Sequence, residues 1–207
     1  MAQYFENANL PSNIVEFETY FLNTKFTFKS DNGVFSKEKL DFGTRLLLEN
    51  LPFKDMNGDI LDLGCGYGVV SIILSKFIDA KFDAVDVNKR ALHLAEMNMK
   101  LNKVTDINYF ESNCYDAIDE NKKYSYIITN PPIRAGKEVV YKMLRGAKDH
   151  LKDDGFLYFV MRKDHGAKTA IRDISDIYNA EVICKEKGFF VIKCFLRWQL
   201  AKNMLII

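Results

Sequence analysis

The sequence predicts an α/β fold in which a mostly parallel seven-stranded sheet carries helices on both faces and an antiparallel hairpin at one edge. Beyond Asp59, short apolar runs alternate with longer segments of helical periodicity, which favours parallel strands joined by helical crossovers. A glycine-rich turn follows the first of these runs, where sheets of this kind bind ligands. The last two runs, "AEVICKEK" and "GFFVIKCF", follow each other without a helix, which predicts the edge hairpin.

An N-terminal extension precedes the alternating part of the chain. The segments "EFETYFL" and "KFTFKS" gather aromatic and β-branched residues around "NT", which predicts a β-hairpin within residues 1–34. The next segment, "SKEKLDFGTRLLLENL", predicts a helix in spite of Gly43, and Pro52 closes it.

Five strands and four helices are expected after this first helix. The strands are Ile60–Leu63, Phe82–Val87, Ile107–Phe110, Tyr124–Thr129 and Phe156–Met161. The helices are Val69–Ile78, Lys89–Leu101, Lys137–Leu151 and Ala167–Tyr178. Because ligands bind beyond the carboxyl ends of parallel strands, chemistry is expected in the loops after the first four strands.

Length and composition bound the class of protein. With 207 residues, 48% of them hydrophobic, the chain is long enough for one substantial core, so we predict a single domain over residues 1–207. It divides into the extension 1–34, a core of residues 35–195 and a C-terminal tail of residues 196–207. The 29 Lys and Arg nearly balance the 28 Asp and Glu, so bulk charge neither indicates nor excludes a nucleic-acid partner.

Cysteine usage and hydropathy indicate the compartment. The four cysteines are scattered without the close pairs typical of metal sites, and we expect them to be reduced. The first residues do not combine a basic segment with an apolar stretch, and no later apolar run approaches the ~20 residues that span a bilayer. We therefore expect a cytoplasmic protein with no membrane segment and no metal, in which His93 and His165 have surface or packing roles.

The turn "LDLGCGYGVV" places Gly64, Gly66 and Gly68 at alternate positions before a helix. Glycine lets the backbone turn tightly and approach a ligand closely, and the first turn of a helix offers free N–H groups. A plain strand-to-helix turn needs fewer glycines, so a ligand loop is favoured. Val69 stands where the dinucleotide fingerprint has its third glycine, which weakens NAD or FAD as the ligand, and no lysine follows in P-loop register.

Asp86 follows the second strand, in "FDAVDVN", 22 residues after Gly64. A carboxylate at this separation from the glycine turn can accept hydrogen bonds from both hydroxyls of a ribose. The combination indicates an adenosine ligand without a pyrophosphate.

Together, "LDLGCGYG", "AVDVN" and "NPP" in successive loops resemble class I S-adenosylmethionine-dependent methyltransferases over about residues 35–195. The resemblance implies their Rossmann-like fold and S-adenosylmethionine as the cofactor. It implies that the methionine end of the cofactor meets Asp62, Gly64, Cys65, Gly66 and Gly68. It places Asp86 and Val87 at the ribose, Asn113 at the adenine, and Asn130 beside the cofactor as well. Asn113 fits a plain turn residue equally well.

Two prolines end the fourth strand, in "TNPPIRAG". Proline donates no backbone hydrogen bond and Pro131 holds Asn130 in an extended conformation, so one side chain is aimed in a narrow range of directions. The exocyclic amine of a base must become more tetrahedral to attack, and two fixed acceptors stabilise that geometry. The Asn130 side-chain oxygen and the Pro131 carbonyl can supply them. A simple strand terminator is the alternative, but after a cofactor loop we favour a catalytic role for Asn130, Pro131 and Pro132.

A closer resemblance links the chain to bacterial small-subunit ribosomal RNA guanine-N2 methyltransferases, particularly the short single-domain members. It rests on "GVFSKEKLDFGTRLLLE", "LDLGCGYGVVSI", "VDVNKRAL" and "NPPIRAGK". It implies ribosomal RNA or a small-subunit particle as the partner and guanine N2 as the methyl acceptor. It also implies that one segment packs beside the cofactor loop and brings near the site Phe35, Ser36, Asp41 and Gly43.

Residues after the prolines are expected to contact the substrate. Ile133 stands where many amino-methylating enzymes carry an aromatic residue that stacks on the base, and Arg134 and Lys137 are placed for phosphate contacts. The helix that follows has a basic stripe, which fits a solvated surface better than an RNA track. The stripe consists of Lys142, Arg145, Lys148 and Lys152.

Two other functions stay open. An adenine amine in DNA or RNA, or a glutamine amide in a protein, presents the same planar NH2 group as guanine. A non-catalytic RNA-binding module could also keep this fold, although it has no physical need for three glycines and a stiffened asparagine.

Overall fold

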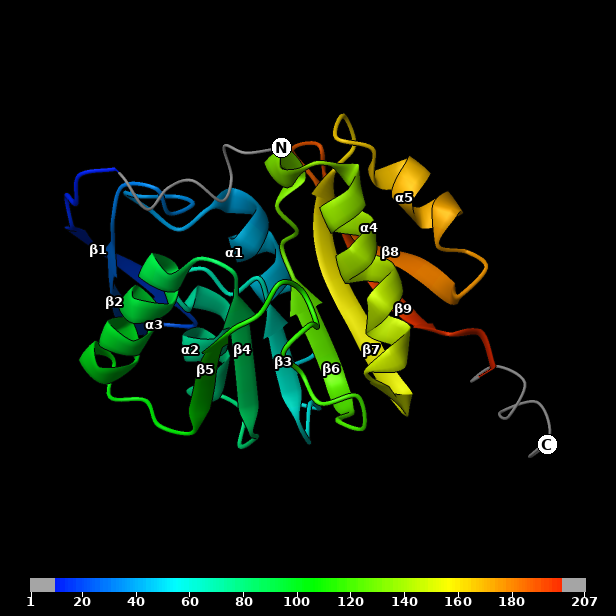
Figure 1. The fold of residues 1–207 in the computed structure, drawn as a ribbon, viewed down its shortest axis with the longest axis horizontal. Coiled ribbons are helices and arrows are strands. Elements are labelled where there is room, and N and C mark those ends of the chain that lie inside the picture. Colours follow the sequence, from blue (N-terminus) through cyan, green and yellow to red (C-terminus); the bar gives the residue numbers. More distant parts are fainter. Residues whose placement is uncertain (1–9, 199–207) are drawn as a thin grey trace.

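The computed structural model of the chain describes residues 10–198. A two-stranded hairpin at one end lies beside a seven-stranded sheet (Figure 1). Residues 199–207 of the predicted tail, 196–207, lie outside the described residues, and the division of the chain into extension, core and tail stays a prediction.

The sheet has the strand order β5-β4-β3-β6-β7-β9-β8. All neighbouring pairs from β5 to β7 are parallel, while β9 runs antiparallel to both β7 and β8. This confirms the predicted mostly parallel sheet and its antiparallel edge hairpin. The chain leaves β3 towards β4 on one side and reaches β6 on the other, which creates a switch point between β3 and β6. The strands are β3 (Ile60–Leu63), β4 (Phe82–Asp86), β5 (Ile107–Glu111), β6 (Tyr124–Thr129), β7 (Leu151–Arg162), β8 (Tyr178–Glu186) and β9 (Phe189–Leu196).

Helices cover both faces of the sheet because successive strand residues point to opposite sides. Ile60 belongs to a buried cluster with α1 to α3 and the hairpin, whereas Leu61 belongs to a second cluster with α4 and α5. Within residues 10–198, no helix has the length and apolar character that crossing a bilayer requires. The helices are α1 (Phe42–Glu49), α2 (Val69–Ser75), α3 (Lys89–Leu101), α4 (Lys137–Gly146) and α5 (Ala167–Asp173), with short 3-10 turns η3 (Ile133–Ala135) and η4 (Ala147–Asp149).

The predicted N-terminal hairpin consists of β1 (Val15–Phe21) and β2 (Thr24–Ser30). Phe26 and Phe28 are almost fully buried against the same core as α1 to α3. Two asparagines one helical turn apart, Asn98 on α3 and Asn102 at its C-cap, bind the outer edge of β2. The Asn102 amide exchanges hydrogen bonds with the N–H and C=O of Thr27, and the Asn98 amide does the same with Lys29.

The first helix begins six residues later than predicted. The Asp41 side chain accepts a hydrogen bond from Thr44 N at 3.0 Å, so Asp41 is the N-cap and α1 starts at Phe42. Ser36, predicted to be helical, has φ +55, which a right-handed helix excludes. Residues 36–41 therefore form an irregular loop that leads from the hairpin to α1.

Three other predicted helices are also too long at their C-termini. α2 ends at Ser75 rather than Ile78, and α4 ends at Gly146, where η4 replaces the expected last turn. Leu151 pairs with Tyr124 as the start of a longer β7, and Tyr178 is the first residue of β8 rather than the last of α5. In these last two cases the residues pair with a neighbouring strand, although their apolar pattern also fits a helix.

Candidate cofactor and catalytic site

The glycine loop after β3 has the backbone conformation that its sequence predicts. Gly64, Gly66 and Gly68 have φ values of +75, +55 and +88, which disfavour residues with a side chain. At Gly68, a Cβ would also lie 2.7 Å from the Tyr109 hydroxyl. The loop therefore requires glycine for its path and for its close packing.

Asp86 lies at the end of β4 with only 8% of its surface exposed. Its Oδ2 accepts a hydrogen bond from Gly66 N at 2.8 Å, and its Oδ1 accepts one from Asn88 N at 2.8 Å. Burial raises the pKa of Asp86, while these backbone donors act in the opposite direction. The same carboxylate thus holds the glycine loop and faces the space beyond it.

Asp62 lies in β3 and is almost fully buried. Its Oδ2 accepts a hydrogen bond from Ser71 N at 2.9 Å, which ties the strand to the first turn of α2. Burial raises the pKa of Asp62 to about 7, and the Asp86 charge adds to this effect. In this structure Asp62 positions the glycine loop through Ser71 and does not line the pocket described next.

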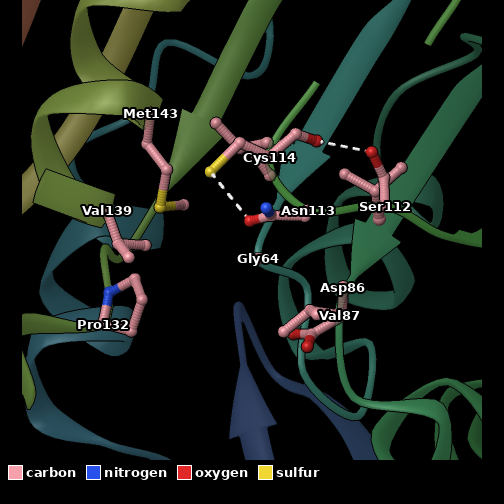
Figure 2. A pocket seen from close by; sticks show the side chains of 11 residues that line it. Gly64, Asp86, Val87, Ser112, Asn113, Cys114, Pro132, Val139 and Met143 are labelled. Atoms are coloured by element: carbon pink, nitrogen blue, oxygen red, sulfur yellow. Dashed lines mark hydrogen bonds between the residues drawn. The ribbon is translucent and has the colours of Figure 1, made fainter. Parts of the chain in front are cut away.

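A pocket opens at the carboxyl ends of the strands around the switch point (Figure 2). Five residues predicted for the site line it: Gly64, Asp86, Val87, Asn113 and Pro132. The sequence interpretation did not identify the remaining lining residues, Leu63, Val85, Ser112, Cys114, Val139 and Met143. Val139 and Met143 are separated by one turn of α4 and therefore lie on the same face of that helix. They were missed because the sequence did not predict that α4 lies over the switch point.

The predicted adenine residue, Asn113, lies in the loop after β5 and points into the pocket beside Cys114 (Figure 2). Cys114 has φ +58, and the Ser112 hydroxyl donates to its carbonyl at 2.8 Å. This unusual backbone turn carries Asn113 to the pocket wall. Other predicted cofactor residues, namely Cys65, Gly66, Gly68 and Asn130, are not among the lining residues.

Asn130 is half-buried at the end of β6, and its side-chain amino group already donates hydrogen bonds within the protein. Its Nδ2 donates to Thr44 Oγ1 at 2.9 Å and to Asp41 Oδ2 at 3.2 Å. A carboxylate can only accept hydrogen bonds, so the amino group must face Asp41 and Oδ1 must point elsewhere. No donor among residues 10–198 reaches Oδ1 of Asn130 or the carbonyl of Pro131.

The loop before α1 also lies against the glycine loop. The Tyr67 hydroxyl donates to the Ser36 carbonyl at 3.1 Å, and Phe35 is 63% exposed beside this contact. Gly43 is packed so tightly that a Cβ there would lie 2.9 Å from the Phe189 ring. The segment that was expected near the site therefore contacts both the glycine loop and Asn130.

The predicted substrate residues follow Pro132 on and near η3. Ile133 is partly buried against the α4 side of the core, whereas Arg134 and Lys137 are exposed. The basic stripe predicted on one helix is wrong in part, because only Lys142 and Arg145 lie on α4, while η4 and β7 contain Lys148 and Lys152. The α4 stripe of Lys142 and Arg145 is neutralised, because Lys142 pairs with Asp116 at 2.7 Å and Arg145 pairs with Asp176 at 2.6 Å. Residues 10–198 contain no group of three or more His, Cys, Asp or Glu arranged to hold a metal ion.

A family model described as "Methyltransferase small domain" matches residues 25–193. The chain belongs to this family. A Bacillus subtilis relative, YbxB, is 38% identical over 192 residues, which are 92% of this chain and 96% of that one. Ribosomal RNA small subunit methyltransferase C of Colwellia psychrerythraea is 36% identical over 83% of this chain, but the match spans only 48% of the relative.

A solved structure shares the fold of this methyltransferase small domain. The 16S rRNA N2 guanine methyltransferase RsmC of T. thermophilus, solved with AdoMet and guanosine, superposes with a TM-score of 0.79 at 24% identity. The match covers 91% of this chain and 52% of that one, so the chain spans about half the length of these two named RNA methyltransferases. Family and fold confirm the predicted class, an S-adenosylmethionine-dependent methyltransferase, and its cofactor, while the roles of single residues stay predictions.

The pocket fits the cofactor of this family. A carboxylate offers about four acceptor positions, and Gly66 and Asn88 use two on Asp86, so acceptor capacity remains for a ribose. Apolar side chains of α4 and the strand ends form the opposite wall, as a purine ring requires. At Gly66 a Cβ would meet nothing within 4 Å, so the loop is open on that side.

Proposed function

We propose that the protein is an N-methyltransferase that modifies an exocyclic base amine in RNA, most specifically guanine N2 of small-subunit ribosomal RNA. The observation that carries this proposal is the orientation of Asn130. Its amino group is bound by Asp41 and Thr44, so its oxygen is available to another donor. Beside it, the Pro131 carbonyl is a second acceptor without a donor among residues 10–198.

Two acceptors on adjacent residues match the two N–H groups of a planar amine. When both N–H groups are bound, the nitrogen lone pair is directed away from them, and the amine is held in the geometry that attack requires. Because Asn130 is fixed before the substrate arrives, its reorientation costs nothing during the reaction. The amine becomes acidic as it is methylated, so neither acceptor needs to be a strong base.

The cofactor supplies an electrophilic methyl group when it is bound. We assign its ribose to Asp86 and Val87, its adenine to Asn113 and the apolar wall with Met143, and its methionine end to the glycine loop. Asp62 acts through Ser71 and the loop, as a residue that positions the loop. Arg134 and Lys137, which are exposed beyond the prolines, are assigned to RNA phosphates.

The choice of guanine over other amines rests on the relatives. An adenine amine or a glutamine amide would satisfy the same two acceptors, so this geometry alone supports all three substrates. The names of the C. psychrerythraea and T. thermophilus relatives favour ribosomal RNA, and the latter names guanine N2.

Labelled S-adenosylmethionine offered to the wild-type protein with ribosomal RNA, small-subunit particles, DNA and total protein tests the proposal. We expect label in small-subunit RNA, recovered as N2-methylguanosine by mass spectrometry of nucleosides. Recovery of N6-methyladenosine or methylated glutamine instead would identify adenine or a glutamine amide as the methyl acceptor. Tight RNA binding with no transfer to any fraction would favour the non-catalytic module. A matched Asn130→Ala protein controls for contaminating methyltransferases.

A further inference from the structure

Surface cations divide into those held by carboxylates and those that are not. At the end of β7, the Arg162 guanidinium is bound by Asp164 through two hydrogen bonds of 2.9 and 2.8 Å. Its neighbour Lys163 is exposed, and no carboxylate of residues 10–198 lies within ion-pairing distance of it. Lys187, in the turn between β8 and β9, forms an ion pair among residues 10–198 only with Glu186, at 3.7 Å, and both side chains are largely exposed. Such exposed pairs are weak, so Lys163 and Lys187 remain able to bind an anion.

Lys163 and Lys187 lie together at the edge of the sheet that carries the site. β7 is parallel to β6, and β8 enters its turn at the same edge, because β9 is antiparallel to both β7 and β8. The two turns touch, since Lys163 N donates to the Gly188 carbonyl at 2.8 Å. Figure 1 shows the β7–α5 turn and the β8–β9 turn at the same end of the molecule as η3. We call Lys163 and Lys187 the distal rim.

Lys187 of the distal rim also contacts the start of α1, next to the residue that binds Asn130. The Lys187 ammonium lies 4.6 Å from the centre of the Phe42 ring, and Phe42 follows Asp41, which binds the Asn130 amide. Along the sheet edge the order is cofactor pocket at β3 to β5, Asn130 at β6, and distal rim at the end of β7 and the β8–β9 turn. At about 5 Å per strand, Lys163 lies about one strand spacing beyond Asn130 and Lys187 lies two to three, both on the side away from the cofactor.

Lys187 occupies a backbone position that does not suit lysine. The two-residue turn has φ +46 at Lys187 and φ +80 at Gly188, and hairpins with two positive φ values favour asparagine, aspartate or glycine at the first position. Asparagine there would relieve the strain but would remove the charge. The β1–β2 turn has the apolar Leu22 at the same φ of +46, so the role of Lys187 is argued from its charge and its place beside the site.

We propose that the distal rim binds the phosphate backbone of the RNA strand that flanks the target base, on the far side of Asn130 from the cofactor. This inference rests on the proposed function and deepens it by giving the strand a direction across the enzyme. RNA then runs from Arg134 and Lys137 over Asn130 to Lys163 and Lys187, and it does not follow α4, where Lys142 and Arg145 are paired with carboxylates.

The test compares Lys187→Asn, Lys163→Gln and the double variant with the wild type. The probe is a fluorescent 12-nucleotide single-stranded RNA with one central guanine, titrated over a series of salt concentrations. Each phosphate contact on a single strand contributes about 0.7 to the salt slope, so near 0.1 M salt each lysine accounts for roughly a fivefold change in Kd. We expect the double variant to bind roughly 25-fold more weakly with a shallower slope. Lys100→Gln, an exposed lysine near the C-terminus of α3, is the matched control and should change Kd less than twofold.

The melting temperature is a second measurement, and it is expected not to fall when RNA affinity falls. Lys187→Asn should melt at the same temperature as the wild type or higher, so weaker RNA binding could not be blamed on misfolding. If the double variant binds RNA within twofold of the wild type while the wild type methylates RNA, the distal rim is wrong and the proposed function stands. If the wild type neither binds nor methylates RNA, the proposed function fails and the rim fails with it.

Discussion

Asn130 is held by its amino group, and this determines which variants can separate chemistry from folding. In Asp41→Asn, residue 41 can still cap α1, because asparagine is as good an N-cap as aspartate. It can, however, offer its own NH2 group and so let the Asn130 amide turn over. We expect kcat for methyl transfer to fall about 10²-fold, with unchanged affinity for S-adenosylmethionine, as measured by single-turnover kinetics and calorimetry.

A double-mutant cycle shows whether Asp41 acts through Asn130. Asn130→Ala alone should lower kcat by about 10²–10³, and adding Asp41→Asn should cause almost no further loss. Independent, multiplying losses would mean that Asp41 has a separate role. Full activity of Asp41→Asn would contradict the orientation argument directly.

Asp62 should make stability depend on pH. Its pKa is raised from 3.8 to about 7 by burial, so the folded protein keeps a proton that the unfolded chain loses. The free energy of unfolding therefore falls as pH rises from about 4 to about 7, and the full penalty is present above this window. Asp62→Asn keeps an acceptor for Ser71 N and should be more stable at pH 8, by at most about 4 kcal/mol.

Thermal unfolding of Asp62→Asn at several pH values measures this difference. The advantage over the wild type should shrink as pH falls and vanish near pH 4, where the wild-type carboxyl is protonated in both states. Asp79→Asn, at an exposed position, is the control and should show no such trend. A constant difference at all pH values would mean that Asp62 does not titrate in this range.

At the scale of single residues, the sequence predicted which residues form a ligand site better than it predicted which residues contact one another. The glycines and Asp86 could be predicted because a ligand turn constrains residue types strongly. The commitment of the Asn130 amino group to Asp41 and Thr44 could not, because these residues lie 89 and 86 positions apart from it. The positive φ of Cys114, which carries Asn113 to the pocket, has no sequence signal either.

Among the elements, α3 has a second task besides covering the sheet. Asn98 is fully buried, and its amide binds Lys29 of β2 and also the carbonyl of Tyr67 in the glycine loop. Asn98→Ala should lower the free energy of unfolding by about 1–3 kcal/mol, because buried backbone groups lose their partners. It should also weaken S-adenosylmethionine binding, since the loop loses a support.

Chemical denaturation and calorimetry measure these two effects of Asn98. Asn98→Asp should be worse than alanine, because it replaces the donors that face two carbonyls with acceptors. Asn108→Ala, whose amide binds Asp83 on the surface, is the matched control and should cost less than about 0.5 kcal/mol. Equal stability of the Asn98 and Asn108 variants would show that the hairpin is held by apolar packing alone.

Element types were predicted well and element ends less well. The helix expected from Ser36 starts at Phe42 because a capping interaction and a positive φ, both local, override an otherwise suitable composition. The strand β7 is longer than its apolar run because Leu151 finds a partner in Tyr124. Pairing of this kind depends on neighbours that are distant in the sequence.

Over the whole molecule, nearly balanced charge conceals an uneven distribution. The α4 stripe is partly neutralised, whereas Arg134 and Lys137 stand exposed beside the prolines. Replacing both with alanine should raise the apparent KM for RNA and reduce its dependence on salt, because fewer counterions are released on binding. Affinity for S-adenosylmethionine should stay the same. Unchanged RNA affinity and salt dependence would show that these two residues do not contact RNA phosphates.

The alternating pattern predicted a parallel sheet but carried no information on which strands are neighbours. β9 inserts between β7 and β8, and this order brings the β8–β9 turn to the edge where the chemistry is placed. The two lysines of the distal rim therefore could not be grouped from the sequence, in which they are separated by α5 and β8.

Asn98 of α3 and its C-cap Asn102 also affect how the hairpin can pair with other chains. An edge strand usually exposes unpaired N–H and C=O groups, which invite pairing with a second molecule. On β2, Asn98 and Asn102 occupy these groups at Lys29 and Thr27, as a neighbouring strand would. Intermolecular pairing is thereby confined to β1, whose exposed positions include Glu16 and Glu18. Repulsion between the Glu16 carboxylates of two copies opposes such edge-to-edge pairing, whereas the Glu18 carboxylate is already paired with Lys25 at 2.6 Å.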